Sequence, residues 1–389
     1  MKILGIETSC DETAICLIEV DEKTREARIL GNIVHSQIDV HASYGGVFPT
    51  LAKREHQRNL VPVLRKALAE AGTLEEAAPA PMPEKIKEIL AREPELLEAF
   101  TASALSIKKP DIDYISVTVG PGLEPALWVG INFARALATL WNVPIIPANH
   151  MEGHILTALV RKNGDSYKII GKEITFPALS LLISGGHTEI VLIEKPGSYR
   201  IVGETRDDAV GECFDKIART LGLAYPGGPK ISKLAAEARA EDINSPEPLP
   251  RPMIDSKDLD FSFSGLKTAV LYLVKRLTDA GALDERAKKG ICREAEDSIM
   301  DVLTAKMRKA AETYAARSIV VGGGVIANTR IRQALETLAA DSSLDMYLPQ
   351  TDHATDNGLM IALAGFFNIE KAVSAETDLK ANGTLRIGK

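Results

Sequence analysis

Short apolar runs that end at turn residues alternate along this chain with longer stretches of helical periodicity. Bounded runs of this kind are typical of buried strands, and they occur at 2–6, 14–20, 114–119, 179–183, 188–194 and 318–321. In the stretch 264–277, by contrast, Leu266, Val270 and Leu273 recur at helical spacing, which predicts a helix with one apolar face. Strands mixed with helices predict an α/β protein.

One order of elements, strand, polar turn and strand, occurs twice. Residues 2–20 form it around the turn Glu7-Thr8-Ser9, and residues 179–194 repeat it around the turn Ser184-Gly185-Gly186-His187-Thr188. Such a repeat predicts two duplicated lobes, and turns rich in Ser, Thr and Gly expose groups that bind anions. Two ordinary hairpins would give the same pattern, so both interpretations stay open.

The segment 75–109 interrupts this organisation. It starts with a Pro-rich stretch, carries mostly acidic charges, and contains Pro94, which prevents a single continuous helix. We expect a surface insertion of two short helices. The expected domains are an N-terminal lobe at 1–148 with this insertion and a returning helix at about 357–373, a C-terminal lobe at 149–356, and a polar tail at 376–389.

Composition excludes several classes of protein. The chain has 389 residues, of which 45% are hydrophobic, enough for about two domain cores at ~150 residues each. It shows no signal-peptide pattern at its start, no apolar run near the ~20 residues of a membrane span, and too few cysteines for a disulfide framework. We expect a soluble, cytoplasmic protein without a membrane partner.

The net charge of −7 means that any nucleic-acid partner needs a local basic patch.

A pair of histidines, His150 and His154, predicts a metal site. Histidines four residues apart project from one face of a helix and suit one metal ion. Glu152 lies ~200° around the helix from His150, whereas zinc proteases carry Glu directly after the first His. Two buried polar histidines are the alternative. Such sites usually need a carboxylate from elsewhere in the chain. One segment offers three further candidate ligands, Asp352, His353 and Asp356. The alternative role for Asp356 is to cap the apolar helix that follows it.

Two glycine-rich turns are candidate nucleotide contacts. A strand runs into Gly322-Gly323-Gly324 and then a helix, and Asp215 precedes the turn Tyr225-Pro226-Gly227-Gly228-Pro229. Glycines let a ligand approach the backbone, and helix N-termini favour anions. Neither turn matches the Rossmann or P-loop pattern, so ordinary surface turns remain an alternative.

A basic stripe is the candidate nucleic-acid contact. Arg54, Arg58 and Arg65 recur on one side of the segment 51–68, opposite leucines at helical spacing. A solvated helix face is the alternative interpretation.

Together these motifs resemble the TsaD family, the bacterial tRNA N6-adenosine threonylcarbamoyltransferases once labelled glycoproteases. Nine blocks follow the family order over nearly the whole chain. The blocks are GIETSCDETA (5–14), YGGVFPTLAKREHQRNL (44–60), GPGLEPALWVG (120–130), NHMEGH (149–154), LLISGGHTEIV (181–191), GECFDKIARTLGLAYPGGP (211–229), LDFSFSGLKTAV (259–270), GGGVIAN (322–328) and TDNGLMIA (355–362).

The resemblance implies an actin-like, Hsp70-like ATPase fold with two duplicated lobes. It also implies transfer of a threonylcarbamoyl group from threonylcarbamoyl-adenylate to N6 of the adenosine next to the anticodon, in tRNAs that read codons starting with A, with release of AMP. The implied partners are tRNA, a TsaB-like paralogous subunit, a TsaE-like P-loop ATPase and a separate synthase that makes the donor.

The resemblance also assigns residues. The implied metal ligands are His150, His154 and Asp356, holding one iron or zinc ion per subunit. An adenylate or ATP-type nucleotide, with or without Mg, is expected at the substrate-binding residues Leu182, Ile183, Ser184, Gly185, Gly186, Asp215, Gly228 and Asn328. Asp11 and Glu12 are candidate catalytic acids, and Arg54 and Arg58 are candidate tRNA contacts.

Three departures from the family pattern and three alternative functions remain. The insertion at 75–109 is longer than usual, Glu124-Pro125 stands where Val-Gly is common, and Ala354 replaces a frequent Cys. A metalloprotease, a stand-alone ATPase or sugar kinase of the same fold, and a catalytically inert scaffold subunit are the alternatives.

Overall fold

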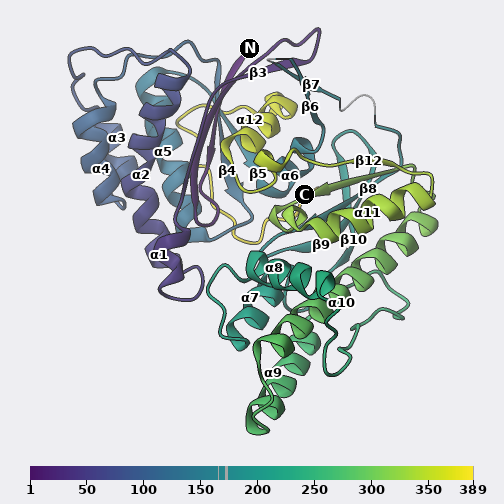
Figure 1. The fold of residues 1–389 in the computed structure, drawn as a ribbon. Helices are drawn as coiled ribbons and strands as arrows, with labels where there is room; N and C mark the ends of the chain where they lie inside the picture. Colours follow the sequence, from purple (N-terminus) through teal and green to yellow (C-terminus); the bar gives the residue numbers. More distant parts are fainter. Residues whose placement is uncertain (165, 171–173, 389) are drawn as a thin grey trace. The chain divides into compact units, whose positions relative to one another are not determined.

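The computed structural model describes residues 1–164, 166–170 and 174–388 and divides into two compact units (Figure 1). The first unit comprises Met1–Lys172 and Thr355–Ile387, and the second comprises Glu173–Ala354. In the part of the chain described here, no helix has the length and apolar character that a membrane crossing requires.

The first unit is built on a sheet with the strand order β5-β4-β1-β2-β3-β7-β6. Its strands are β1 (Lys2–Glu7), β2 (Glu12–Val20), β3 (Glu26–Ser36), β4 (Tyr114–Gly120), β5 (Ile145–Asn149), β6 (Val160–Asn163) and β7 (Ser166–Ile169). Its helices are α1 (Ile38–Ala42), α2 (Pro49–Glu70), α3 (Glu84–Leu90), α4 (Pro94–Ala99), the π-helical turn η1 (Phe100–Ala104), α5 (Glu124–Trp141), α6 (His150–Thr157), α12 (Gly358–Phe367) and η4 (Ile369–Lys371).

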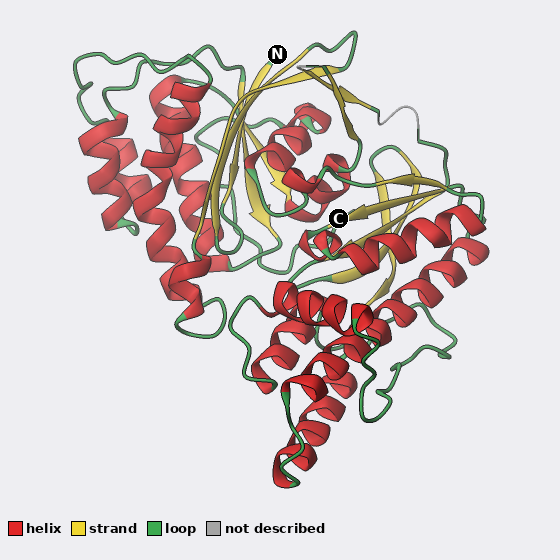
Figure 2. Ribbon diagram, viewed as in Figure 1, coloured by secondary structure: helices red, strands yellow, loops and turns green. Residues whose placement is uncertain are grey.

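Both faces of this sheet are covered by helices (Figure 2). Side chains alternate along a strand, so Leu4 and Ile6 of β1 enter the core shared with α2 and α5. Gly5 faces α12, and a Cβ built there would lie only 2.3 Å from the carbonyl oxygen of Gly358. The absence of a side chain therefore lets α12 lie directly on β1, on the face to which Glu7 also points.

The second unit repeats this topology. Its sheet has the order β10-β9-β8-β11-β12, with β8–β9 and β9–β10 antiparallel and β8–β11 and β11–β12 parallel. The segment β3-β2-β1-β4-β5 has the same order and the same strand directions. The repeat of strand, turn and strand seen in the sequence is thus part of a duplicated sheet, which confirms the two-lobe expectation.

The second unit's elements span most of the chain between residues 178 and 353. Its strands are β8 (Ala178–Ile183), β9 (Thr188–Lys195), β10 (Ser198–Glu204), β11 (Ser318–Gly322) and β12 (Asp345–Tyr347). Its helices are α7 (Val210–Thr220), α8 (Gly227–Ala240), α9 (Ser264–Asp279), α10 (Glu285–Thr313), η2 (Gly324–Ala327), α11 (Thr329–Asp341) and η3 (Thr351–His353). The long helix α10 packs against both α8 and α11.

The insertion forms two short helices, α3 and α4, as expected, with Pro94 at the start of the second. It is more than a surface appendage, because Ile86, Leu90, Leu96 and Phe100 are fully buried in the core formed with α2 and α5. The unusual Pro125 lies in the first turn of α5, where proline is well tolerated.

The division between the units falls after residue 172, whereas the expected boundary fell after residue 148. Two contacts explain the difference. Strand β7 pairs with β3 and so extends the first sheet, and α6 packs against α12. The histidines of α6 consequently belong to the first unit, together with Asp356.

Candidate metal centre and nucleotide cleft

Helix α6 starts directly at the end of strand β5, and this junction positions the two histidines. The side chain of Asn149 caps the helix, since its Oδ1 accepts hydrogen bonds from the backbone N–H groups of Met151 (2.9 Å) and Glu152 (3.1 Å). The cap fixes the first turn. His150 therefore begins the helix and His154 follows one turn later on the same face.

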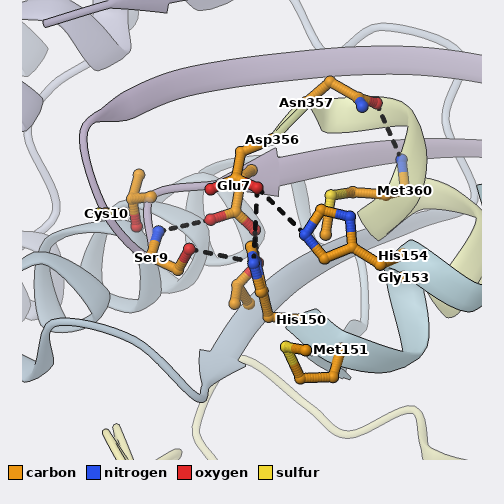
Figure 3. Close-up of polar contacts among 12 residues, drawn as sticks. Glu7, Ser9, Cys10, His150, Met151, Gly153, His154, Asp356, Asn357 and Met360 are labelled. Atoms are coloured by element: carbon orange, nitrogen blue, oxygen red, sulfur yellow. Dashed lines mark hydrogen bonds and ion pairs between the residues drawn. The ribbon is translucent and has the colours of Figure 1, made fainter. Parts of the chain in front are cut away.

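Asp356 lies immediately before α12 and does not cap it. The cap is Asn357, whose Oδ1 accepts a hydrogen bond from the N–H of Met360 (3.2 Å); the interpretation of Asp356 as a helix cap is wrong. The Oδ1 atom of Asp356 lies 3.6 Å from Nε2 of His150 and 3.2 Å from Nε2 of His154 (Figure 3). The carboxylate thus faces both imidazole rings.

These three side chains form a possible metal site. One ligand atom from each lies within 4.8 Å of the others, and the two rings are 4.7 Å apart between centroids, at 86° to each other. His154 is 1% exposed, yet neither ring nitrogen has a hydrogen-bond partner. Buried polar atoms are nearly always paired, and a metal ion would pair the Nε2 atom. Two imidazoles and a carboxylate suit zinc or iron.

The other two candidate ligands from the same segment are not members of this cluster. Asp352 and His353 belong to the turn η3 in the second unit. Glu152 is also outside it, because its Oε2 accepts a hydrogen bond from Nδ2 of Asn368 (3.1 Å) beyond the end of α12. The cluster therefore lacks the adjacent glutamate of a zinc protease.

Two side chains that the sequence pattern did not single out orient His150. Its Nδ1 lies 3.2 Å from Oε2 of Glu7 and 3.1 Å from Oγ of Ser9. Glu7 is fully buried, and it also accepts hydrogen bonds from Oγ of Thr118 (2.5 Å) and the N–H of Ser9 (2.5 Å). Carboxylates placed behind a histidine in this way fix the ring and strengthen it as a ligand. The turn Glu7-Thr8-Ser9 was visible in the sequence, but only as a candidate anion contact.

Negative charge is in excess around the cluster. Burial lowers the pKa of His150, but Asp356 and Glu7 outweigh burial and raise this pKa to about 9. Burial, Asp356 and Asp11 together raise the pKa of Glu12 well above its usual value. Such mutual repulsion between carboxylates is what a bound cation relieves. Asp11 is buried and Glu12 is half-buried beside this charge, and their catalytic roles stay a prediction.

Cys10 is not among the three residues of this cluster. Burial and the acids Asp11, Asp356 and Glu12 raise the pKa of its thiol well above the usual range.

A separate cleft lies within the second unit. It has a volume of about 480 Å³, within the usual range for small-molecule sites, and it is bounded by α7, the start of α8, and the segment from η2 into α11. Phe214, Pro226 and Val325 provide apolar walls, and Asp215 and Asn328 provide polar groups. The Oδ1 atom of Asp215 accepts a hydrogen bond from the N–H of Gly227 (2.7 Å), which holds the turn against α7.

Four of the eight expected substrate-binding residues line this cleft, namely Gly185, Asp215, Gly228 and Asn328. Leu182 and Ile183 end β8 with fully buried side chains, so only their backbone can contact a ligand. Ser184 closes the turn that follows, because its Oγ accepts a hydrogen bond from the N–H of His187 (3.1 Å). Gly186 is exposed in the same turn.

The glycine run after β11 brings two chain segments into close contact. Gly323 has a φ of +94°, and a Cβ built there would lie 2.4 Å from the carbonyl oxygen of Ile183. Glycine is therefore required where β11 leads into η2 beside the end of β8.

The basic stripe on α2 faces the acidic insertion. Nε of Arg54 lies 3.0 Å from Oε1 of Glu95, and Nε of Arg58 lies 2.5 Å from Oε2 of the same residue. Arg65 pairs in the same way with Glu76. These pairs favour an intramolecular role for the stripe, and a tRNA contact at Arg54 and Arg58 stays a prediction.

Comparisons with known proteins converge on one family. The family model described as TsaD, tRNA N6-adenosine threonylcarbamoyltransferase, matches residues 28–78 and 90–363. A protein of that name from Chromobacterium violaceum is 41% identical over 376 residues, covering 96% of this chain and 95% of its own length. Another from Burkholderia cenocepacia is 41% identical over 369 residues, covering 94% and 91% respectively.

A solved structure shares the fold at low sequence identity. Full-length HypF in its phosphate- and nucleotide-bound form matches 97% of this chain and 56% of its own, with a TM-score of 0.52 and 11% identity. Together with the duplicated sheets, this likeness confirms the actin-like ATPase fold.

Loss of one imidazole should empty the metal centre. We expect wild-type protein to hold close to one iron or zinc ion and His154→Ala to hold only a trace, because two ligands rarely retain such ions. Elemental analysis of the purified proteins measures this. His353→Ala is the matched control and should keep its metal; equal metal content in all three proteins would contradict the assignment.

Loss of the carboxylate behind His150 should weaken the centre without removing a ligand. We expect Glu7→Gln to lower metal affinity by about 10–100-fold, the usual effect of losing such a supporting carboxylate. Chelator competition gives the dissociation constants. Ser116→Ala, which removes a buried hydrogen bond to the backbone of Ile361 on α12, serves as the control and should bind metal as the wild type does.

Proposed function

The chain belongs to the TsaD family of tRNA N6-adenosine threonylcarbamoyltransferases, and we propose that its histidine–aspartate cluster holds a metal ion and that the cleft of its second unit binds a nucleotide. The reaction moves a threonylcarbamoyl group from threonylcarbamoyl-adenylate to N6 of the adenosine next to the anticodon. A C–N bond to N6 forms, the bond from the carbamoyl carbon to the phosphate oxygen breaks, N6 loses a proton, and AMP leaves.

We propose that the cluster of the first unit is the metal centre used in the transfer. His150, His154 and Asp356 would hold the ion, and Glu7 and Ser9 would keep the His150 ring aligned. When bound, iron or zinc supplies Lewis acidity toward the carbonyl oxygen. The observation that carries this proposal is the convergence of one ligand atom each from His150, His154 and Asp356 within 4.8 Å of one another, with both imidazoles buried.

We propose that the cleft of the second unit binds an adenine nucleotide. Apolar walls such as Phe214 and Val325 suit the base, and the Asp215 carboxylate suits ribose hydroxyl groups. In the turn Ser184–Gly186, the N–H of Ser184 donates to the carbonyl oxygen of His187 (2.9 Å), and we propose that the N–H groups of Gly185 and Gly186 contact the phosphate. Two side-chain-free positions there, Gly185 and Gly186, have open space around them, so a phosphate can approach the backbone.

An exocyclic amine is a weak nucleophile, so positioning and stabilisation of the leaving AMP must supply much of the rate enhancement. Asp11 and Glu12 are the acids that we propose to handle the N6 proton, since both lie within the charged surroundings of Asp356. Asp11, which is buried, and Glu12, which is half-buried, would provide carboxyl groups for this proton transfer close to Asp356.

Other proteins must supply the donor. The chain contains no G-x-x-x-x-G-K-[ST] pattern, so an ATP-driven step that needs a P-loop requires a second chain. We propose a separate synthase for threonylcarbamoyl-adenylate, a TsaB-like paralogous subunit and a TsaE-like P-loop ATPase as partners. We also place the reaction in the cytoplasm, where the four free cysteines remain reduced.

A transfer assay tests the function and the centre together. Preformed threonylcarbamoyl-adenylate labelled in the threonine part is incubated with unmodified tRNA, the partner proteins and each variant. We expect label at the anticodon-loop adenosine with wild type and with His353→Ala, and its loss with the double variant His150→Ala, His154→Ala, which lacks both imidazole ligands. Labelling that survives in the double variant would make the metal structural, and no labelling with wild type would contradict the function.

Charge reversal on α2 tests the proposed tRNA contact. If Arg54 and Arg58 bind phosphates, Arg54→Glu with Arg58→Glu weakens tRNA binding and reduces its dependence on salt concentration, because fewer counterions are released. Filter binding across a salt series measures both. Glu95→Gln removes the carboxylate that both arginines contact and should strengthen tRNA binding; an unchanged salt slope in the double variant would limit these arginines to holding the insertion.

A further inference from the structure

A fully buried glutamate on helix α10, Glu296, contacts a residue that lines the cleft of the second unit. Both carboxylate oxygens of Glu296 are used: Oε1 accepts a hydrogen bond from Nδ2 of Asn328 (2.6 Å), and Oε2 accepts one from Nη1 of Arg239 (2.5 Å). A buried carboxylate is costly unless it is paired and hydrogen-bonded. Nothing in the metal centre or in the substrate-binding residues accounts for this one.

Its two partners come from different elements of the cleft. Arg239 lies on α8, whose Ser232, Lys233 and Ala236 line the cleft. Asn328 is the residue at which η2 leads into α11, and it lines the cleft itself. Glu296 thus links α8 to Asn328 through a single side chain on a third helix.

The contact also fixes which way the Asn328 amide points. The Oδ1 atom of Asn328 caps α11 by accepting a hydrogen bond from the N–H of Ile331 (3.0 Å), while Nδ2 donates to Glu296. Turning the amide over would place its NH₂ group against an N–H and its oxygen against a carboxylate. An amide nitrogen has two N–H donors, so the second one stays available at a residue that lines the cleft.

We propose that Glu296 is a positioning residue for the nucleotide: it holds Asn328 so that a hydrogen-bond donor, never an acceptor, is presented to the ligand, and it sets the spacing of Asn328 from α8. This inference rests on the proposed assignment of the cleft to the adenylate. The ligand chemistry that it favours is a nucleotide group with an acceptor atom facing Asn328.

AMP binding to the purified full chain tests this role. Both partners of Glu296 are hydrogen-bond donors. The glutamine of Glu296→Gln has only one oxygen, which can accept from Asn328 or from Arg239, and its NH₂ group then faces the donor group of the other residue. We expect the dissociation constant for AMP, measured by calorimetry, to rise about tenfold, the effect of losing one well-placed hydrogen bond to a charged ligand.

Asp297→Asn is the matched control. Asp297 is the next residue on α10 and holds the same arginine, with Oδ1 2.6 Å from Nη2 of Arg239, but no hydrogen bond joins it to Asn328 in the described structure. We expect about a twofold change in AMP affinity or less, within the range of exposed ion pairs. The Tm of each variant is recorded, because a purely structural role would lower AMP affinity and Tm together in both.

A double-variant cycle separates positioning from general stability. Asn328→Ser keeps a good helix cap but removes the amide that contacts Glu296. Adding Glu296→Gln to it should cause no further loss of AMP affinity, because the coupled group is already gone. Glu296→Asp, which keeps the buried charge but withdraws the carboxylate by one methylene, should also weaken AMP binding and is the substitute if Glu296→Gln fails to fold.

The possible outcomes are distinct. Equal losses of affinity in the Glu296 and Asp297 variants, or full additivity with Asn328→Ser, would overturn the positioning role while leaving the cleft assignment intact. A wild-type chain that does not bind AMP would overturn the cleft assignment and this inference with it. The positioning role is established if AMP affinity falls in the Glu296 variants but not in Asp297→Asn, and if Glu296→Gln causes no further fall when Asn328→Ser is already present.

Discussion

The direct packing of α12 on β1 and β2 is the contact on which the metal centre depends. Gly5 and Gly358 make it possible: a Cβ on Gly358 would lie 2.4 Å from the backbone nitrogen of Cys16, and one on Gly5 would strike Gly358 itself. Interiors are close-packed, and such overlaps are destabilising. Because the chain returns from the second unit at residue 355 and enters this contact at once, Asp356 is delivered to the face of α6 that carries both histidines. A side chain at either glycine would displace the carboxylate from its partners.

The same face concentrates charge that is expensive to bury. Glu7 is fully buried, and the His150 imidazole is its principal compensating group: burial raises the pKa of Glu7, but His150 lowers it overall. Removing one member of a buried pair typically costs about 3–5 kcal/mol. The first unit therefore keeps an unfavourable polar interior at the ends of β1 and β5, where a purely structural sheet would place apolar residues. Departures of this kind from an apolar interior are typical of functional sites.

The sequence predicted the parts of this protein that depend on local spacing. Histidines four apart, the apolar runs of β1, β2, β4, β8, β9 and β11, and the break at Pro94 all follow from short-range rules. What it could not predict is decided by packing between distant segments. Glu7 and His150 are separated by 143 positions, and Arg58 looks like part of a free basic stripe until α4 places Glu95 against it. The role of Asp356 was ambiguous for the same reason, since only the structure shows that Asn357 is the cap.

The fold alone would not separate this chain from a kinase or another ATPase, because one fold hosts many unrelated reactions. HypF shares the architecture at 11% identity. The function is therefore determined by a few side chains placed on this fold, and not by the fold itself. Those side chains occur at the start of two helices of the first unit. His150 begins α6 after β5, and Asp356 precedes α12. A sugar kinase needs neither histidine, and a zinc protease needs a glutamate beside the first one, whereas Glu152 is committed to Asn368. The side chains of this cluster therefore fit neither alternative, which agrees with the family to which the chain belongs.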